Sequence, residues 1–251
     1  MDVDRFAALV ARPGTRMASV QHASADVGTM QSVAECARLA RAAGVLFHTD
    51  ACQSLAHLPL DARALGVDLL SISSRKAYGP SGAGALFARR GLSPDTLLRG
   101  RDRHAAPTLG LPALAGMAAA LIAMRPRVAD LAGRLWALSQ RLRQGLEGCG
   151  RVLGHPTWRV PHIVSVAVSG VDRETLFMTL EDRGIQAGEA ATAVLAKAEL
   201  VEPDDVVIRF GLTAESTAED IDRVLNVLPN AVERLRGMAA RAGLPGLQGE
   251  S

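Results

Sequence analysis

Short apolar runs separated by longer mixed segments are the feature that most limits how this chain can fold. Val45–Phe47 and Asp68–Ser73 are two such runs, and Ala83–Ala88 is a third. A helix with a capping box at Ser32 precedes the first run, and the segment after it is long enough for a crossover helix that ends near Gly66. Strands joined by helical crossovers form a mostly parallel sheet with helices on both faces. The sequence therefore predicts an α/β fold whose functional residues lie beyond the carboxyl ends of the strands.

A second α/β pattern begins after an amphipathic helix. Leucines recur every three or four residues from about Val128 to Gly148, which predicts a helix that links two domains. The pattern that follows consists of strands at 163–168 and 206–211 and of helices at 173–183 and from Ala218. Pro229 predicts a kink or a break in the last helix. We expect a large domain at 1–112, linking helices at 113–150, a small C-terminal α/β domain at 151–245 and a disordered tail at 246–251.

Composition and charge argue against several classes of function. Lys and Arg number 28 against 26 for Asp and Glu, and no dense basic block attracts nucleic acid or anionic lipid. Aromatic residues make up only 3%, too few for a base-stacking surface. Leu111–Met124 is uncharged but shorter than the roughly 20 residues of a membrane span, so it predicts a buried helix. We expect neither nucleic acid nor a membrane as a partner.

The cysteines and the first residues indicate a reducing compartment. Three cysteines, at positions 36, 52 and 149, form no C-x-x-C pair and no metal-ligand spacing with histidine. Met1–Asp4 carries acid where a secretory signal carries positive charge, and no apolar segment follows. We expect a cytoplasmic protein without a metal site. Four histidines show no ligand spacing and are expected at the surface or in caps: His57, His104, His155 and His162.

Two charged residues stand just past the ends of predicted strands. Asp50 follows the first apolar run and Lys76 follows the second, so both face the same edge of the sheet. A carboxylate there can keep a heteroaromatic nitrogen protonated, and a desolvated amine can attack a carbonyl carbon. Together they suit pyridoxal phosphate, in which a lysine holds the aldehyde and an aspartate keeps the ring able to accept electrons. The alternatives from spacing alone are an aspartate that caps a helix and a solvated lysine.

Both charged residues lie within longer motifs. These are V-L-F-H-T-D-A-C-Q-S at 45–54 and D-L-L-S-I-S-S-R-K-A-Y-G-P-S-G-A-G-A-L at 68–86. The motifs resemble the cysteine desulfurase group of the class V aminotransferase family. The resemblance extends from Ser19, through 160–166 and 208–212, to about Leu235. It implies fold type I, a pyridoxal 5'-phosphate cofactor, and a homodimer with its active sites at the subunit interface.

The resemblance also implies roles for individual residues. Lys76 matches the catalytic lysine that carries the cofactor, and Asp50 matches the partner of the pyridine nitrogen. Arg209 matches the arginine that clamps the substrate carboxylate as a two-pronged ion pair. The other contacts implied are to the phenolic oxygen or the phosphate of the cofactor, from Gln53, Ser73, Arg75 in place of the family's histidine and, from the neighbouring subunit, Thr108.

This sequence also departs from the family pattern. Ala191 stands where the family has its nucleophilic cysteine, and an alanine cannot take up sulfur. Cys52 is no replacement, because it follows the Asp50 strand in a position that the family does not use for chemistry. Arg75 replaces a histidine that contacts the phosphate, and Ala25 replaces an asparagine near the phenolic oxygen. The glycine-rich loop before Thr108 is shortened to 98–103.

Two hypotheses of function follow. The first is a pyridoxal phosphate-dependent enzyme that acts on a cysteine-like amino acid by C–S cleavage or related chemistry, without a persulfide cysteine. The second is a catalytically degenerate, truncated family member with a structural or regulatory role, which dimerises with a complete paralogue. Ala191 and the absence of the family's first strands before Met1 favour the second hypothesis, since a sheet without those strands exposes an edge and an apolar face. The retained Asp50 and Lys76 favour the first.

Overall fold

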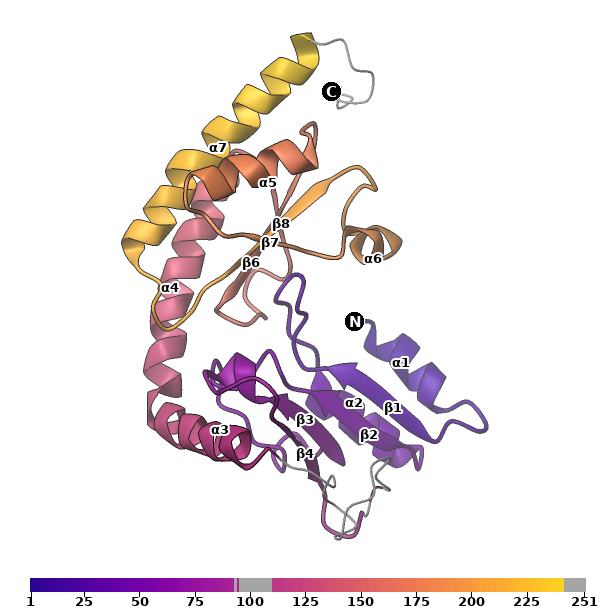
Figure 1. The fold of residues 1–251 in the computed structure, drawn as a ribbon. Helices are drawn as coiled ribbons and strands as arrows, with labels where there is room; N and C mark the ends of the chain where they lie inside the picture. The colour runs from indigo at the N-terminus through magenta and orange to yellow at the C-terminus, as the bar shows by residue number, and fades with distance from the viewer. Residues whose placement is uncertain (93, 95–109, 242–251) are drawn as a thin grey trace. The chain divides into compact units, whose positions relative to one another are not determined.

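The chain folds into two compact units, which are described separately (Figure 1). The structure is a computed structural model that describes residues 1–92, 94 and 110–241. The first unit comprises Met1–Ser24 and Met30–Asp130, and the second comprises Ala25–Thr29 and Leu131–Ser251. The domain limits expected at 112 and 150 stay predictions. Thr108, the loop at 98–103 and the tail at 246–251 lie outside the described residues.

The first unit is built around a mostly parallel sheet in the order β1-β2-β3-β4. Strands β1, β2 and β3 run parallel, and β4 pairs with β3 in the antiparallel direction. The α/β class and the mostly parallel sheet are confirmed. The elements of this unit are α1 (Val3–Val10), β1 (Met17–Gln21), α2 (Val33–Ala42), β2 (Leu46–Asp50), β3 (Leu69–Ser73), the 3-10 helix η1 (Ser74–Ala77), β4 (Gly84–Ala88), α3 (Leu111–Met124) and the 3-10 helix η2 (Arg125–Arg127).

Two local expectations for the first unit are wrong, the crossover helix before β3 and the capping box at Ser32. The segment between β2 and β3 forms turns rather than a crossover helix, because Pro59 lacks a backbone donor and disfavours helical geometry at the preceding residue. The short connection at 74–83 cannot carry a parallel crossover, so β4 returns as an antiparallel neighbour. Helix α2 forms as expected, but Ser32 makes no side-chain capping bond.

Helices α1 and α2 cover one face of this sheet. Phe6 of α1 and Val33 of α2 belong to the same buried cluster as Phe47 and Leu70 from the strands. The Phe6 and Phe47 rings meet edge to face, with centroids 5.9 Å apart. Side chains of the opposite face remain accessible to solvent, and the larger apolar ones are Met17 at 48%, Leu46 at 37% and Leu86 at 52% exposed.

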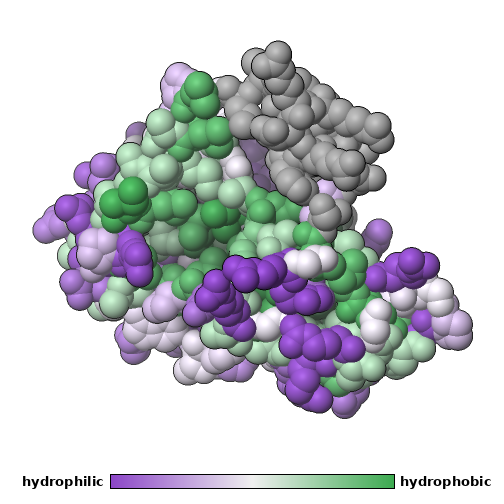
Figure 2. Space-filling model, turned by 90° about the horizontal axis from the view of Figure 1, so that it is seen from below, coloured by the Kyte–Doolittle hydropathy of each residue, from purple (hydrophilic) through white to green (hydrophobic). Residues whose placement is uncertain are grey.

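Helix α3 differs from the buried helix that its composition predicts. Met117 is its one buried residue, whereas Leu111 and Ile122 are 71% and 74% exposed. Apolar side chains gather on the side of the first unit where α3 lies (Figure 2). The continuous helical stretch Leu111–Leu146 is long and apolar enough to cross a membrane, by length and composition only. Its apolar part, α3, is about 21 Å long, which is shorter than a hydrocarbon core of about 30 Å.

The second unit contains an antiparallel sheet in the order β5-β6-β8-β7. Every residue of β6 is buried, and helices α4, α5 and α7 lie on one side of this sheet (Figure 1). Helix α7 continues through Pro229, so of the expected kink or break the break does not occur, and Thr217 and Asp220 cap its first turn reciprocally. The elements are α4 (Val128–Leu146), which begins in the first unit, β5 (Arg151–Leu153), β6 (Ile163–Val168), α5 (Arg173–Asp182), β7 (Gly188–Glu189), α6 (Thr192–Lys197), β8 (Val206–Gly211) and α7 (Ala218–Arg241).

A segment from early in the sequence, Ala25–Thr29, belongs to this second unit and is held there by a buried arginine. Arg159 is 3% exposed, and burial lowers the pKa of its guanidinium to about 10. Its Nη2 donates to the carbonyl oxygens of Val27 at 3.2 Å and Ile163 at 2.7 Å, and its Nη1 donates to the carbonyl oxygen of Leu153 at 3.1 Å. One guanidinium thus joins the segment to β5 and β6.

Replacement of this guanidinium should unfold the second unit more easily. Arg159→Met removes the guanidinium hydrogen bonds to several buried carbonyl oxygens, so we expect the free energy of unfolding to fall by about 3 kcal/mol or more in urea titrations. Arg151→Met is the matched control, because Arg151 is 57% exposed and its nearest carboxylate oxygen, on Asp205, is 3.8 Å away. We expect that control to lose less than about 1 kcal/mol. Equal losses in the two variants would contradict this role for Arg159.

Candidate functional site

The carboxyl ends of β1, β2 and β3 meet at one edge of the first sheet. The parallel register aligns Gln21 with Asp50 and Asp50 with Ser71. Asp50 is therefore the last residue of its strand, and β3 ends at Ser73, directly before η1. Neighbouring strands lie roughly 4.8 Å apart. The register thus brings the residues that follow β2 and β3 to the same edge.

Lys76 lies in η1, and the surrounding turn is tightly folded. The backbone N–H of Ser74 donates to the Ala83 carbonyl oxygen at 3.0 Å, and that of Gly79 donates to the Ser74 carbonyl oxygen at 3.0 Å. A Cβ atom on residue 79 would lie 2.3 Å from Ser74 Oγ, so only glycine fits there. Tyr78 ends η1 in the left-handed region, with φ of 63°. The half-buried Lys76 is thus presented from a turn with little freedom.

Charged neighbours affect the pKa of the Cys52 thiol, which lies in the turn directly after Asp50. Asp50 Oδ1 accepts a hydrogen bond from the backbone N–H of Cys52 at 2.8 Å. Burial, followed by a hydrogen bond with Asp50 and its negative charge, raises the pKa of the Cys52 thiol to about 12, while the positive charge of Lys76 acts in the opposite direction. The turn after β2 thus ties the Asp50 carboxylate to the backbone of Cys52, and burial together with this carboxylate favours the protonated thiol.

A buried histidine also supports this edge of the sheet. His57 is 6% exposed, its Nδ1 donates to the Leu55 carbonyl oxygen at 3.1 Å, and its Nε2 accepts from the Tyr78 hydroxyl at 3.3 Å. This contact joins the turn after Asp50 to the turn that carries Lys76.

The expectation that His57 and His162 lie at the surface is wrong, since both are buried. Their spacing gave no signal, because packing of distant turns buries them. His155 does cap a turn, and His104 lies outside the described residues.

The residues at this edge fit the cofactor that the resemblance implies. Gln53 and Ser73 are half-buried there, and Arg75 is exposed. Three buried polar atoms near the ends of the same three strands have no hydrogen-bond partner within the described ranges: His22 Nδ1, Ser54 Oγ and Ser74 Oγ. Buried polar groups in native proteins require a partner, which a ligand or water supplies. An amine, a carboxylate, an amide, hydroxyls and a guanidinium match an aldehyde, a pyridine nitrogen, a phenolic oxygen and a phosphate.

Arg209 and Ala191 lie in the second unit. Arg209 Nη1 donates to the carbonyl oxygen of Ala25 at 3.0 Å. The backbone N–H of Ala191 donates to Asp26 Oδ1 at 3.0 Å, and Ala191 then precedes α6 as its N-cap. The side chain of residue 191 is a methyl group, so this loop offers neither a thiol nor any other nucleophile at that position.

In the chain that the structure describes, no three His, Cys, Asp or Glu residues form a group that could hold a metal.

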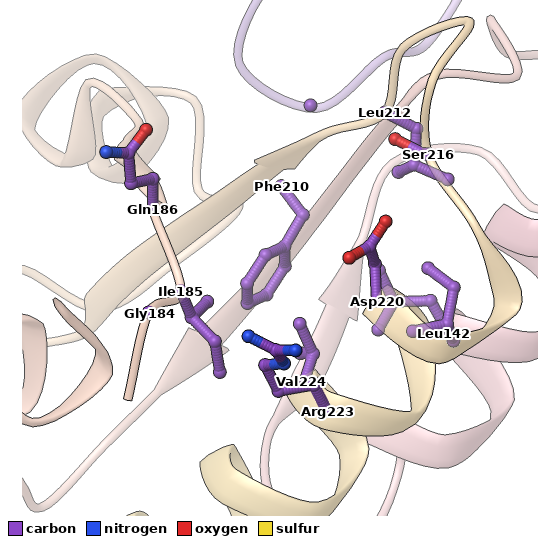
Figure 3. A pocket seen from close by; sticks show the side chains of 12 residues that line it. Leu142, Gly184, Ile185, Gln186, Phe210, Leu212, Ser216, Asp220, Arg223 and Val224 are labelled. Carbon is purple, nitrogen blue, oxygen red and sulfur yellow. The ribbon is translucent and has the colours of Figure 1, made fainter. Parts of the chain in front are cut away.

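A cavity of about 180 Å³ also lies in the second unit (Figure 3). Phe210 and Arg223 point into it, and the Asp220 carboxylate at its rim already accepts hydrogen bonds from Thr217. Arg209 precedes Phe210 on β8, and successive side chains of a strand point to opposite faces. The cavity is therefore separated from Arg209 by the sheet, and none of the predicted site residues lines it.

The raised pKa of Cys52 predicts an unreactive thiol. At pH 8 a thiol with a pKa of about 12 is ionised roughly a thousandfold less than one with a pKa of 9. We expect iodoacetamide to alkylate Cys52 correspondingly slowly, with a rate that keeps rising above pH 10, as followed by peptide mass spectrometry. The same cysteine in urea should react with a midpoint near its ordinary pKa. A midpoint near 9 in the folded chain would contradict this account.

Burial of His57 predicts a loss of stability in mild acid. Burial lowers its pKa from 6.5 to about 4, so between these values the unfolded chain binds a proton that the folded chain does not. The stabilisation is complete above pH 6.5 and decreases as the pH falls toward 4, by up to about 3 kcal/mol. We expect urea titrations of His57→Gln to show a weaker dependence on pH in this window than those of the unmodified chain. Parallel pH curves for the two proteins would contradict the assignment.

Comparison with known proteins agrees with the motifs. The aminotransferase class-V family model matches residues 1–224. The cysteine desulfurase IscS of Anaeromyxobacter dehalogenans is 38% identical over 247 residues, which cover 91% of this chain and 60% of that protein. The IscS of Methanosarcina thermophila is 32% identical over 246 residues, with the same two coverages. The chain thus spans about 60% of the length of these curated relatives.

Solved structures show the same fold. A NifS-like protein superposes with a TM-score of 0.86 at 25% identity, over 94% of this chain and 66% of that one. The apo structure of a cysteine desulfurase from Thermococcus onnurineus NA1 gives a TM-score of 0.80 at 22% identity, over 94% and 64% of the two chains. These likenesses confirm the fold, and the match of the family model assigns the ancestry. The chain belongs to the aminotransferase class-V family.

Proposed function

We propose that this chain is a pyridoxal phosphate-dependent enzyme that cleaves the C–S bond of a cysteine-like amino acid by β-elimination. The observation that supports the proposal is the parallel register, which brings Asp50 at the end of β2 and the turn that carries Lys76 after β3 to one edge of the sheet, combined with an alanine at position 191. The first feature retains the residues that hold the cofactor. The second removes the thiol on which a cysteine desulfurase of this family would collect sulfur.

Each residue has a separate task in this reaction. Lys76 Nζ would hold the cofactor and serve as the base for the proton on the substrate α-carbon. Asp50 would pair with the pyridine nitrogen and keep it protonated. Arg209 binds the substrate carboxylate through two parallel hydrogen bonds. The remaining contacts to the cofactor would come from Gln53, Ser73 and Arg75 and, from the neighbouring subunit, Thr108, as the resemblance implies.

The atoms of this reaction balance without a redox partner. Pyridoxal phosphate, when bound, supplies a ring that accepts the electron pair of the broken Cα–H bond. The Cβ–S bond then breaks, and its electron pair leaves with the sulfur, which takes up a proton and is released as hydrogen sulfide from cysteine or as a thiol from an S-substituted cysteine. Addition of water to the three-carbon remainder gives pyruvate and ammonia. No protein nucleophile attacks the sulfur, so Ala191 does not prevent the reaction.

A second subunit covers α3 in this proposal. Helix α3 has no charged side chain, and Met117 alone among its residues is buried within the described chain. Large exposed apolar patches mark interaction sites in proteins, and the apolar surface in Figure 2 is of this kind. We propose a homodimer, as in the family that the sequence resembles. The second candidate is a non-catalytic chain that pairs with a complete paralogue through the same helix, and Ala191 is the observation that favours it.

The visible spectrum separates the two candidates. The chain contains two lysines, Lys76 and the exposed Lys197. We expect added pyridoxal phosphate to give a visible absorbance band that is lost in Lys76→Ala and retained in Lys197→Ala, because Lys76 follows β3 at the sheet edge where β2 ends in Asp50, whereas Lys197 belongs to the second unit. Absence of the band from the unmodified protein would favour the non-catalytic candidate, and its persistence in Lys76→Ala would contradict the assigned lysine.

The products then identify the reaction. With cysteine as substrate, we expect pyruvate and sulfide in equal amounts, measured by a coupled dehydrogenase and by a colorimetric sulfide reagent. Alanine formed together with protein-bound sulfur would contradict β-elimination, because that outcome requires a nucleophilic thiol.

A further inference from the structure

The loop that carries Ala191 also places a glycine directly against Arg209. Strand β7 pairs with β8 so that Gly188 lies opposite Arg209, and directly opposed residues have Cβ positions about 5 Å apart. A Cβ atom on residue 188 would lie 3.1 Å from Arg209 Nη2, 3.4 Å from Nε and 3.6 Å from Cζ. The guanidinium therefore occupies space that any other residue at position 188 would partly fill.

The hydrogen bond to Ala25 fixes which edge of this guanidinium is available. An arginine has five N–H donors in a rigid planar fork. In the described part of the chain, the Ala25 carbonyl oxygen is its one hydrogen-bond acceptor, and it takes a hydrogen from Nη1. Nε and Nη2, which together form the side edge that binds carboxylates in two-pronged fashion, keep their hydrogens free. These are also the two atoms nearest to the position that a Cβ atom on residue 188 would occupy.

We infer that Gly188 is a specificity-determining residue for the substrate carboxylate. Its bare α-carbon leaves the Nε–Nη2 edge of Arg209 open, and the Ala25 carbonyl oxygen orients that edge from the other side. This inference rests on the role of Arg209 in the proposed function. It extends that role to two positioning residues, one in the segment Ala25–Thr29 and one in the loop before Ala191.

The variant Gly188→Ala distinguishes a role in carboxylate binding from a role in the stability of the fold. The contacts it would make are to the end of a flexible side chain, so the guanidinium can move aside and the fold is retained. Gly188→Ala should therefore tilt Arg209 and weaken carboxylate binding while the temperature of unfolding changes little. Gly211→Ala is the matched control, since it lies on the same strand as Arg209 and a Cβ there meets no atom within 4 Å.

The test is a titration with propionate, which carries a carboxylate but no amino group that could react. Arginine labelled with ¹⁵N reports on Nε directly, and the signal of residue 209 is assigned by its loss in Arg209→Lys. In the full chain we expect propionate to shift this signal, and Gly188→Ala to require on the order of tenfold more propionate for the same shift. Gly211→Ala should titrate like the unmodified protein.

Two outcomes would overturn the inference. One is an Arg209 signal that does not respond to propionate in the unmodified chain, and the other is a titration of Gly188→Ala that matches it. Both are distinct from a failure of the proposed function. The titration needs only the guanidinium, whereas a missing visible band with pyridoxal phosphate counts against the enzyme itself.

Discussion

The parallel pairing of β1, β2 and β3 is the constraint on which the first unit depends. Because the strands run in one direction, their carboxyl ends share an edge, and the register aligns Gln21, Asp50 and Ser71 across it. Residues that are distant in sequence, the turn after Asp50 and the turn that carries Lys76, then meet through the hydrogen bond between His57 and Tyr78. Backbone pairing thus brings the turn after Asp50 and the turn that carries Lys76 to one edge of the sheet.

The segment Ala25–Thr29 plays a comparable part in the second unit. Arg159 holds it through the Val27 carbonyl oxygen, and Asp26 accepts the backbone N–H of Ala191. The same segment supplies the Ala25 carbonyl oxygen to Arg209. Five consecutive residues therefore connect the buried arginine, the loop at position 191 and the guanidinium proposed to bind substrate. A change at Arg159 is expected to affect this arrangement through the segment rather than by direct contact.

Much of this organisation can be predicted from the sequence, and the failures have physical causes. Apolar runs and helical periodicity located β3, β6, α5 and α7 to within a residue or two at their starts, because side-chain patterning follows burial on one face. The turns that replace the crossover helix depend on Pro59, whose local effect overrides chain length as a signal.

Features that arise from long-range packing had no sequence signal. The burial of His57 and Arg159 depends on partners far along the chain, including Tyr78 for the first and Val27 for the second. Helix α3 was expected to be buried because composition reports only that a segment is apolar. Composition does not report whether a covering surface comes from the same chain, and within the described residues α3 buries only Met117. The candidate site was read from motifs, and the geometry adds the contacts that position it.

The most direct measurement of the central claim is the location of the covalent bond to the cofactor. Borohydride reduction after incubation with pyridoxal phosphate, followed by peptide mass spectrometry, should place the added mass on the peptide that contains Lys76, in one copy per chain and with Lys197 unmodified. Labelling of Lys197 with Lys76 left unmodified would contradict the account.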